Sequence, residues 1–331
     1  MDKENFMSVI NYLKLKDGKF FPFPIYLILS KKFNKNLEFP KEVELIYKKI
    51  RVCNFVINKT YNFNKEEIKR IGMKLYKTNS LNHPGYLFFK QEKGTYVAGE
   101  IKNFNKTILK EINFSTPEMI KNKLIKLKKI VGFHTRNVPH KGHEWIHDLG
   151  IKKCNNILIQ PIVGHFKKGE YSEEIVIKIN KFLVKKKNEL NQNKKYFFSF
   201  INIFPKYAGP REALLHALIR RNYGCTHFLV GRDHAGYKKF YKIYEAQNLC
   251  LKYQEKLKIK ILKFKSPKLC KYCKKVLNKK CNCSLFKNYN DLVDINGSYI
   301  RDLLKKNKNV PPYLMSKYIY KKLKNKKVLI K

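Results

Sequence analysis

The sequence lacks any long apolar run. None of its hydrophobic stretches approaches the roughly 20 residues that a transmembrane helix needs. The first residues, MDKENFMSVI, lack the layout of a secretory signal peptide. These absences predict a soluble, cytoplasmic protein with no membrane partner. The motif G-x-x-x-x-G-K-[ST] is also missing, which excludes a phosphate-binding loop of that kind and a fused kinase domain built on it.

Acidic residues are scarce relative to basic ones. Asp and Glu number 25 against 72 Lys and Arg, which gives a formal net charge of +47. Such a charge often indicates binding to nucleic acid or to an anionic membrane surface. Here the lysines are spread along the whole chain, and no basic run is interleaved with stacking aromatic rings. We therefore expect no specific nucleic-acid partner, although the charge can attract anionic substrates at low salt.

The length and composition allow more than one folded domain. The 331 residues are 44% hydrophobic and 14% aromatic, which is enough for two or three domains with cores of their own. The first part of the chain shows short β-rich runs, such as FPFPIYLILS and TYVAGEI, broken by Gly, Pro and Asn. We expect an α/β protein with an N-terminal β-rich domain over 1–115, a central α/β domain over 116–290 and a small C-terminal α-rich domain over 291–331.

The central part of the chain alternates between apolar strands and amphipathic helices. Alternation of this kind predicts a doubly wound parallel sheet with helices on both of its faces. The expected strands are 129–133, 156–161, 197–204, 226–231 and 258–264, and the expected helices lie near 140–152, 172–187, 210–223 and 238–256.

A first polar loop follows the first of these strands. Residues 132–144 read GFHTRNVPHKGHE, and ligands of open parallel sheets bind beyond the carboxyl ends of the strands. His140 and His143 are three residues apart, so they would lie on one face of the first helical turn, where the helix N-terminus favours anions. With Arg136 and Asn137 just before them, the pair suits a polyphosphate. Ordinary surface histidines are the alternative.

A second polar loop belongs to residues 206–236, which read KYAGPREALLHALIRRNYGCTHFLVGRDHAG. Pro210 opens the expected helix, Glu212 suits its first turn, and Gly224 closes it. The following strand runs into the segment GRDHA, residues 231–235, at the same predicted edge of the sheet. We expect the two loops to form two halves of one site.

The eight cysteines fall into two groups. Four are scattered among apolar neighbours and are expected to be small buried residues. The other four, Cys270, Cys273, Cys281 and Cys283, follow the spacing C-x2-C-x7-C-x-C. In an intracellular protein, paired spacings favour zinc over disulfides, and four thiolates complete a tetrahedral structural site. We therefore expect a structural Zn²⁺ within an insert at residues 270–283.

Taken together, these motifs resemble ATP sulfurylase (sulfate adenylyltransferase), a family of the nucleotidylyltransferase superfamily with an H-x-G-H motif. The resemblance extends nearly from end to end, through FPFPIYL, QPIVG, KYAGPREA, GCTHFLVGRDHAG and INGSYIRDLL. It implies a PUA-like N-terminal domain and a central nucleotidylyltransferase domain. It also implies adenylyl transfer from MgATP to sulfate, and a homo-oligomer, with a dimer favoured.

The resemblance also implies roles for individual residues. Thr135 and Asn137 would hold the α-phosphoryl region, and Arg136 with the backbone of Ala235 would bind sulfate. His140 and His143 would stabilise the pyrophosphate side in the transition state. The expected nucleotide contacts are Gly231, Arg232, Asp233 and His234.

One departure from the family pattern bears on the acceptor. His134 stands where the family has glutamine. Because a histidine can gain a proton near neutral pH, acceptor binding is expected to strengthen as the pH falls toward 6. The departure keeps open a related nucleotidylyltransferase with another acceptor, and a decayed basic scaffold or nucleic-acid binder is the alternative from a different class. The physiological direction of the reaction also stays open.

Overall fold

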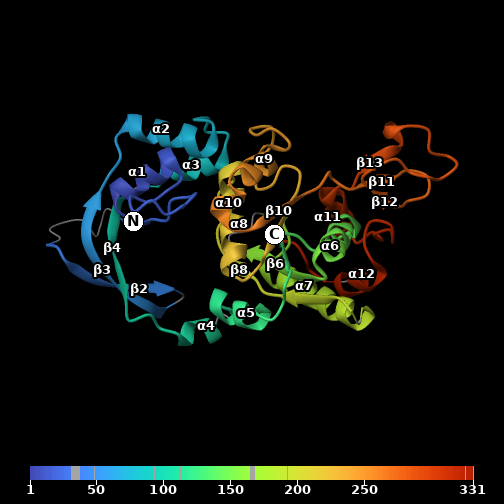
Figure 1. Cartoon of the computed structure of the whole chain (residues 1–331), viewed down its shortest axis with the longest axis horizontal. Coiled ribbons are helices and arrows are strands. Elements are labelled where there is room, and N and C mark those ends of the chain that lie inside the picture. The colour runs from blue at the N-terminus through green and yellow to red at the C-terminus, as the bar shows by residue number, and fades with distance from the viewer. Residues whose placement is uncertain are drawn as a thin grey trace. The chain divides into compact units, whose positions relative to one another are not determined.

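The computed structural model describes residues 1–30, 38–47, 49–92, 94–111, 114–164, 168–191, 193–324 and 326–330. Figure 1 shows its helices and strands. The chain forms two compact units. Unit 1 consists of Met1–Thr116, Lys206–Ile219 and Asp233–Lys258, and unit 2 of Pro117–Pro205, Arg220–Arg232 and Ile259–Lys331. The domain boundaries expected from the sequence stay a prediction.

Unit 1 contains an antiparallel sheet in the order β1-β4-β3-β2. Its longest strand, β3, alternates between buried and less buried residues, as a strand with one covered face does. Phe55, Ile57 and Val97 form the apolar cluster on that face. The strands are β1 (Leu27–Leu29), β2 (Lys41–Tyr47), β3 (Ile50–Tyr61) and β4 (Thr95–Lys102).

The helices of unit 1 begin and end at recognisable signals. Asn64 and Glu67 form a reciprocal capping box at the start of α2, and Pro84 opens α3. The helices in this part are α1 (Lys3–Tyr12), α2 (Lys65–Tyr76), α3 (Pro84–Gln91), α4 (Thr107–Glu111), α9 (Glu245–Lys252) and α10 (Gln254–Leu257), with α8 (Pro210–Asn222) beginning here.

The segment after residue 236 differs from the expectation. A helix was expected over 238–256, but α9 begins only at Glu245. Tyr241 is buried, and its hydroxyl donates to the Tyr207 carbonyl at 2.9 Å and lies 3.1 Å from His83 Nε2. This anchoring of a side chain favours a turn, so tertiary contacts override the helical pattern here.

Unit 2 contains the parallel sheet that the sequence predicts. Its order is β10-β9-β5-β6-β7, with the short β8 beside β6, and every pair is parallel. The expected strand over 197–204 is divided into β7 and β8. The bounds are β5 (Val131–Thr135), β6 (Asn156–Val163), β7 (Lys195–Phe198), β8 (Ile201–Asn202), β9 (His227–Val230) and β10 (Lys260–Lys263).

Helices cover both faces of this sheet. A Cβ atom on Gly150 of α6 would lie within 3.7 Å of Val131, Ile157 and Leu229, so α6 packs closely on that face. A Cβ atom on Gly132 would point to the other face, where it would meet Arg220 of α8. The helices α5 (Pro117–Leu124), α6 (Lys141–Cys154) and α7 (Glu173–Leu190) belong to unit 2, and α6 and α7 contact the strands of this sheet. The doubly wound arrangement is confirmed.

The order of strands also locates the ligand edge. The chain runs from β5 outward through β6 and β7, and it then returns to β9 on the other side of β5. In doubly wound sheets the crevice beyond the carboxyl ends at such a reversal is the ligand site. The loops after β5 and β9 therefore start at the reversal.

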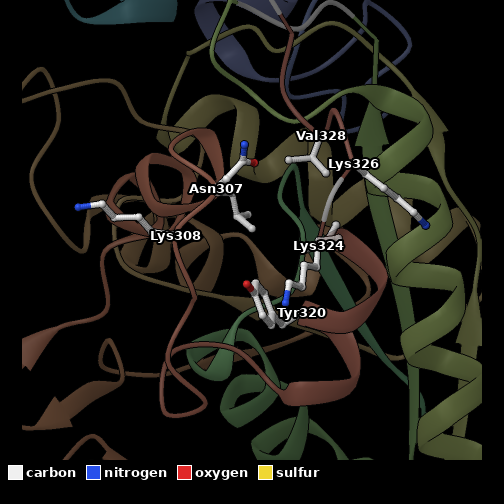
Figure 2. Close-up of a pocket in the computed structure, with 8 residues that line it drawn as sticks. Asn307, Lys308, Tyr320, Lys324, Lys326 and Val328 are labelled. Carbon is white, nitrogen blue, oxygen red and sulfur yellow. The ribbon is translucent and has the colours of Figure 1, made fainter.

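The last part of unit 2 holds a small antiparallel sheet and two helices. They are β11 (Lys268–Cys270), β12 (Val276–Leu277), β13 (Leu292–Asp294), α11 (Gly297–Lys305) and α12 (Lys317–Leu323). A cavity of about 20 Å³ lies here, with Tyr320 and Leu323 among its lining residues. Lys308 and Lys326 point away from it (Figure 2). The cavity is about the size of one water molecule.

Across the described ranges, no helix combines the length and the apolar character needed to cross a membrane.

Candidate active site

The loop after β5 is held by its own side chains and by its neighbours in unit 2. Thr135 is buried, and its Oγ1 accepts a hydrogen bond from the Asn137 backbone N–H at 3.0 Å. Asn180 Nδ2 of α7 donates to the Asn137 carbonyl at 3.2 Å. Arg301 Nη1 of α11 lies 3.5 Å from Asn137 Oδ1. The loop is therefore fixed before any ligand arrives, and it gathers two arginines, Arg136 and Arg301, around one stretch.

His140 and His143 form a reciprocal cap at the start of α6. His140 is the N-cap, and its Nδ1 accepts from the backbone N–H groups of Gly142 at 3.1 Å and of His143 at 3.4 Å. His143 Nδ1 accepts in return from the His140 N–H at 3.4 Å. Because backbone N–H groups only donate, both Nδ1 atoms are acceptors, and the ring proton of each histidine sits on Nε2.

The two rings are stacked and neutral. Their centroids lie 3.8 Å apart, with 27° between the planes. Burial lowers the pKa of His140 to about 4, with a further contribution from nearby His147. Burial and the neighbouring His140 lower the pKa of His143 well below its usual value. At neutral pH the pair therefore offers two Nε2–H donors at a helix N-terminus, where an anion is favoured.

Glu144, the next residue of α6, ties this helix to the C-terminal part of unit 2. The carboxylate is buried and accepts from Ser316 Oγ at 2.5 Å and from Tyr318 Oη at 2.7 Å. Lys187 Nζ of α7 lies 3.6 Å from it. The backbone adds a bond from the Lys141 N–H to the Leu314 carbonyl at 2.8 Å. The network fixes the start of α6, and no motif in the sequence indicated it.

Gly231 and Arg232 lie in unit 2, directly after β9. A Cβ atom on Gly231 would come within 2.8 Å of the Phe264 ring, so the close approach of this ring requires glycine. Arg232 is 39% exposed and lies 3.6 Å from Asp294. The guanidinium is therefore close to one carboxylate but open to solvent, where a phosphate could compete for it.

Asp233, His234 and Ala235 belong to unit 1, where they form a strained turn. Asp233 and Ala235 have φ values of 49° and 58°, a region that residues other than glycine seldom adopt. The Asp233 N–H donates to the Ile243 carbonyl at 2.8 Å, and the Gly209 N–H donates to the Ala235 carbonyl at 3.0 Å. Strain of this kind concentrates at functional sites, so the turn fits the predicted binding role.

His234 is connected to a buried carboxylate within unit 1. Its Nε2 lies 3.1 Å from His216 Nδ1, and His216 Nε2 lies 3.5 Å from the Glu212 carboxylate. Glu212 also accepts from the backbone N–H groups of Lys206 and Ala208. Burial acts to raise the pKa of this carboxyl, but the His216 and backbone contacts outweigh burial and lower the pKa. The ionised carboxylate thus orients His216, and His216 orients His234.

The four clustered cysteines lie together around β11 and β12. Their Sγ atoms all lie within 4.8 Å of one another. Cys270 and Cys283 are 3.7 Å apart, and Cys273 and Cys281 are 3.5 Å apart. Zn–S bonds of about 2.3 Å in a tetrahedron give S–S separations of roughly 3.8 Å, so the four thiols fit such an ion. Burial acts to raise the pKa of Cys270, but the Cys273 and Tyr272 N–H groups outweigh it and the pKa is lowered to about 7.

Comparisons with known proteins agree with this geometry. Residues 113–326 match the ATP-sulfurylase family model, and residues 1–106 match the model of a PUA-like domain. The sulfate adenylyltransferase of Pyrococcus abyssi is 30% identical over 328 residues, which cover 98% of this chain and 83% of that relative. The sulfate adenylyltransferase of Persephonella marina is 32% identical over 320 residues, which cover 94% and 80%.

A similar fold occurs among solved structures. The structure described as "Hexameric APS kinase from Thiobacillus denitrificans" aligns with a TM-score of 0.69 at 14% identity. The alignment covers 98% of this chain but only 57% of that chain, so this protein spans less than two thirds of its length. At this identity the likeness shows the fold alone. The expected fold class, a PUA-like N-terminal part with a parallel-sheet nucleotidylyltransferase core, is confirmed.

Proposed function

This chain belongs to the ATP sulfurylase family, and from that premise we propose that it transfers the adenylyl group of MgATP to sulfate. The products are adenosine 5′-phosphosulfate and pyrophosphate. One observation in the structure supports this most directly. His140 and His143 cap the start of α6, in the loop that follows β5, and each ring carries its proton on Nε2 as a donor. A site of this kind suits an oxyanion whose charge grows as a bond breaks.

The proposed step is a direct displacement. A sulfate oxygen attacks the α-phosphorus, and the bond from that phosphorus to the oxygen bridging to the β-phosphorus breaks. The pyrophosphate leaves with the electron pair, so no proton has to be transferred. His140 and His143 donate from Nε2 to the departing pyrophosphate. Catalysis here consists of positioning and charge stabilisation, which fixed donors supply without reorganisation.

The remaining site residues are proposed as binding groups. Thr135 and Asn137 hold the α-phosphoryl region, and Arg136, His134 and the backbone of Ala235 bind the acceptor. Gly231, Arg232, Asp233 and His234 contact the nucleotide, and Mg²⁺ enters with ATP. Arg301 joins this set because it lies beside Asn137 and α11 presents it toward the same loop.

The test is release of pyrophosphate by the purified protein. We expect release only when ATP, Mg²⁺ and sulfate are all present, because sulfate is the nucleophile. Omitting each component in turn provides the controls. Release that does not depend on sulfate but depends on another oxyanion or a phosphorylated acceptor would favour the related nucleotidylyltransferase that His134 keeps open. Supplying adenosine 5′-phosphosulfate with pyrophosphate measures the reverse direction.

We also propose that the four clustered cysteines hold one structural Zn²⁺. The metal would cross-link the end of β11 and the turn after it to the segment that follows β12. A site closed by four thiolates leaves no position for substrate. We expect chelator-washed protein to retain one zinc ion per chain by elemental analysis. Cys270→Ser should abolish metal binding. It should lower the melting temperature clearly but change kcat little, because the binding energy of structural zinc is folding energy.

Cys250→Ser is the matched control, since this thiol is also fully buried but stands alone in α9. It should leave the zinc content unchanged. Wild-type protein without metal, or a Cys270→Ser variant that still holds a full equivalent, would contradict the proposed site.

We propose a homo-oligomer, with a dimer favoured. Unit 1 exposes large apolar side chains, among them Ile46 and Ile101, which are 63% and 64% exposed. Side chains of this kind at a surface are compatible with a subunit contact.

A further inference from the structure

Arg220 contacts two neighbouring strands of the parallel sheet, β5 and β6, close to the carboxyl end of β5. It lies near the end of α8 and is fully buried. Its Nη2 donates to the Gln160 carbonyl at 2.9 Å and lies 3.0 Å from His134 Nδ1. His134 and Gln160 are partners in the register of β5 and β6. One guanidinium nitrogen therefore links a strand carbonyl to the imidazole at the carboxyl end of β5.

The strand leaves space for the stem of this arginine. A Cβ atom on Gly132 would come within 2.6 Å of Arg220 Cγ and within 3.2 Å of Arg220 Cβ. Gly132 and His134 point to the same face of the sheet, because side chains alternate along a strand. The missing side chain of Gly132 thus forms the path by which Arg220 reaches His134. Any larger residue would displace the stem.

The contact determines which nitrogen of His134 carries the proton. Burial lowers the pKa of Arg220 to about 10, so the guanidinium remains charged at neutral pH. A charged guanidinium has only donors, so His134 Nδ1 must accept. The proton of the neutral ring is then on Nε2. A second proton on Nδ1 would break this bond and place two cations next to each other.

We propose that Arg220 is a positioning residue that holds His134 as an Nε2–H donor for the oxyanion acceptor. The proposal rests on the proposed function and names the chemical basis of acceptor choice. Sulfate has only lone pairs, so it needs a donor at this position. The other tautomer would turn a lone pair toward it and would instead suit a hydroxyl group. The Arg220 contact thereby makes His134 a hydrogen-bond donor to the oxyanion.

The first test reads the tautomer directly. Two-bond ¹H–¹⁵N spectra of ¹⁵N-labelled protein at pH 7.5 distinguish protonated from unprotonated imidazole nitrogens, and His134 is assigned by the signals lost in His134→Gln. We expect a protonated Nε2 and an unprotonated Nδ1 in the wild type. Arg220→Met, which has no donor, should shift the signals toward a mixture of states. An Nδ1–H ring in the wild type would overturn the proposal.

The second test is a double-mutant cycle on acceptor binding. Arg220→Met should raise the sulfate KM about tenfold, as for loss of one oriented hydrogen bond, and should change kcat less. A glutamine at position 134 offers an amide donor that needs no tautomer, so Arg220→Met should add little in the His134→Gln background. Additive effects of the two substitutions would show a merely structural role and would contradict the proposal.

A third variant covers the case in which Arg220→Met fails to fold. Gly132→Ala keeps the guanidinium but displaces its stem, so it should raise the sulfate KM in the same direction. An unchanged KM with an unchanged His134 spectrum would contradict the path described above. The spectra and the activity assay together separate the role of Arg220 from the proposed reaction. If pyrophosphate release depends on sulfate but His134 carries its proton on Nδ1, only the role of Arg220 is contradicted. If His134 carries its proton on Nε2 but no sulfate-dependent release of pyrophosphate occurs, only the proposed reaction is contradicted.

Discussion

Replacing His140 or His143 by alanine is expected to lower kcat on the order of 10²-fold, the usual cost of losing one charge-stabilising donor. Each ring is neutral and presents Nε2–H, because Nδ1 is occupied by the cap of α6. The loss should therefore appear in kcat rather than only in the KM for ATP, provided that the donors act on the departing pyrophosphate. Initial rates of sulfate-dependent pyrophosphate release at saturating substrates measure it.

Two further variants separate catalysis from helix capping. His140→Asn supplies a side chain that is among the best N-caps but has no donor at the Nε2 position. It should therefore retain the stability of the wild type and still lose activity. His227→Ala is the control for position, because His227 lies at the amino-terminal end of β9, away from the carboxyl ends of the strands. Unchanged kcat in both His140→Ala and His143→Ala would limit these two residues to capping α6.

Glu144→Ala should lower the free energy of unfolding by about 3–5 kcal/mol, which is typical when one partner of a buried charged network is removed. The substitution removes the acceptor of the buried Ser316 hydroxyl and of the half-buried Tyr318 hydroxyl, and it leaves Lys187 with Asp148 as its partner at 3.7 Å. Equilibrium unfolding in urea measures the loss. Because these bonds hold the start of α6, some loss of kcat is expected together with the loss of stability.

Glu189→Ala gives the matched control for this change. Glu189 lies on α7 and pairs with Lys186 at 3.1 Å, but both side chains are exposed. Exposed pairs contribute at most about 1 kcal/mol. A loss in Glu144→Ala no larger than that in Glu189→Ala would show that the buried network does not hold α6.

Much of the central fold could be predicted because its signals are local. The alternation of strands and helices gave the parallel sheet, and the order of polar loops placed residues 132–144 at its carboxyl edge. The role of His140 as a cap was missed, since histidine is not among the preferred N-cap residues. The sequence placed it inside the helix, but α6 begins at Lys141.

The features that the sequence missed depend on distant contacts. Arg220 and His134 are 86 residues apart, and nothing in the pattern of α8 distinguishes the buried Arg220 from its half-buried neighbour Arg221. The contact also alters an expectation. Arg220 disfavours a second proton on His134, and Arg136 carries positive charge two residues away. A gain in acceptor affinity toward pH 6 no longer follows.

The stacked, neutral imidazoles at the start of α6 have a thermodynamic consequence for ligand binding. Pyrophosphate brings negative charge to rings whose pKa values are depressed in the free protein, and opposite charge raises the pKa of a histidine. An added proton has to enter at Nδ1 and break a cap bond of α6, and repulsion between stacked cations limits the pair to one such proton. Binding and proton uptake are then coupled, so affinity for pyrophosphate rises as the pH falls toward the free-state pKa of about 4 of His140. The heat of binding would vary with the ionisation enthalpy of the buffer, which makes the histidine pair visible to calorimetry.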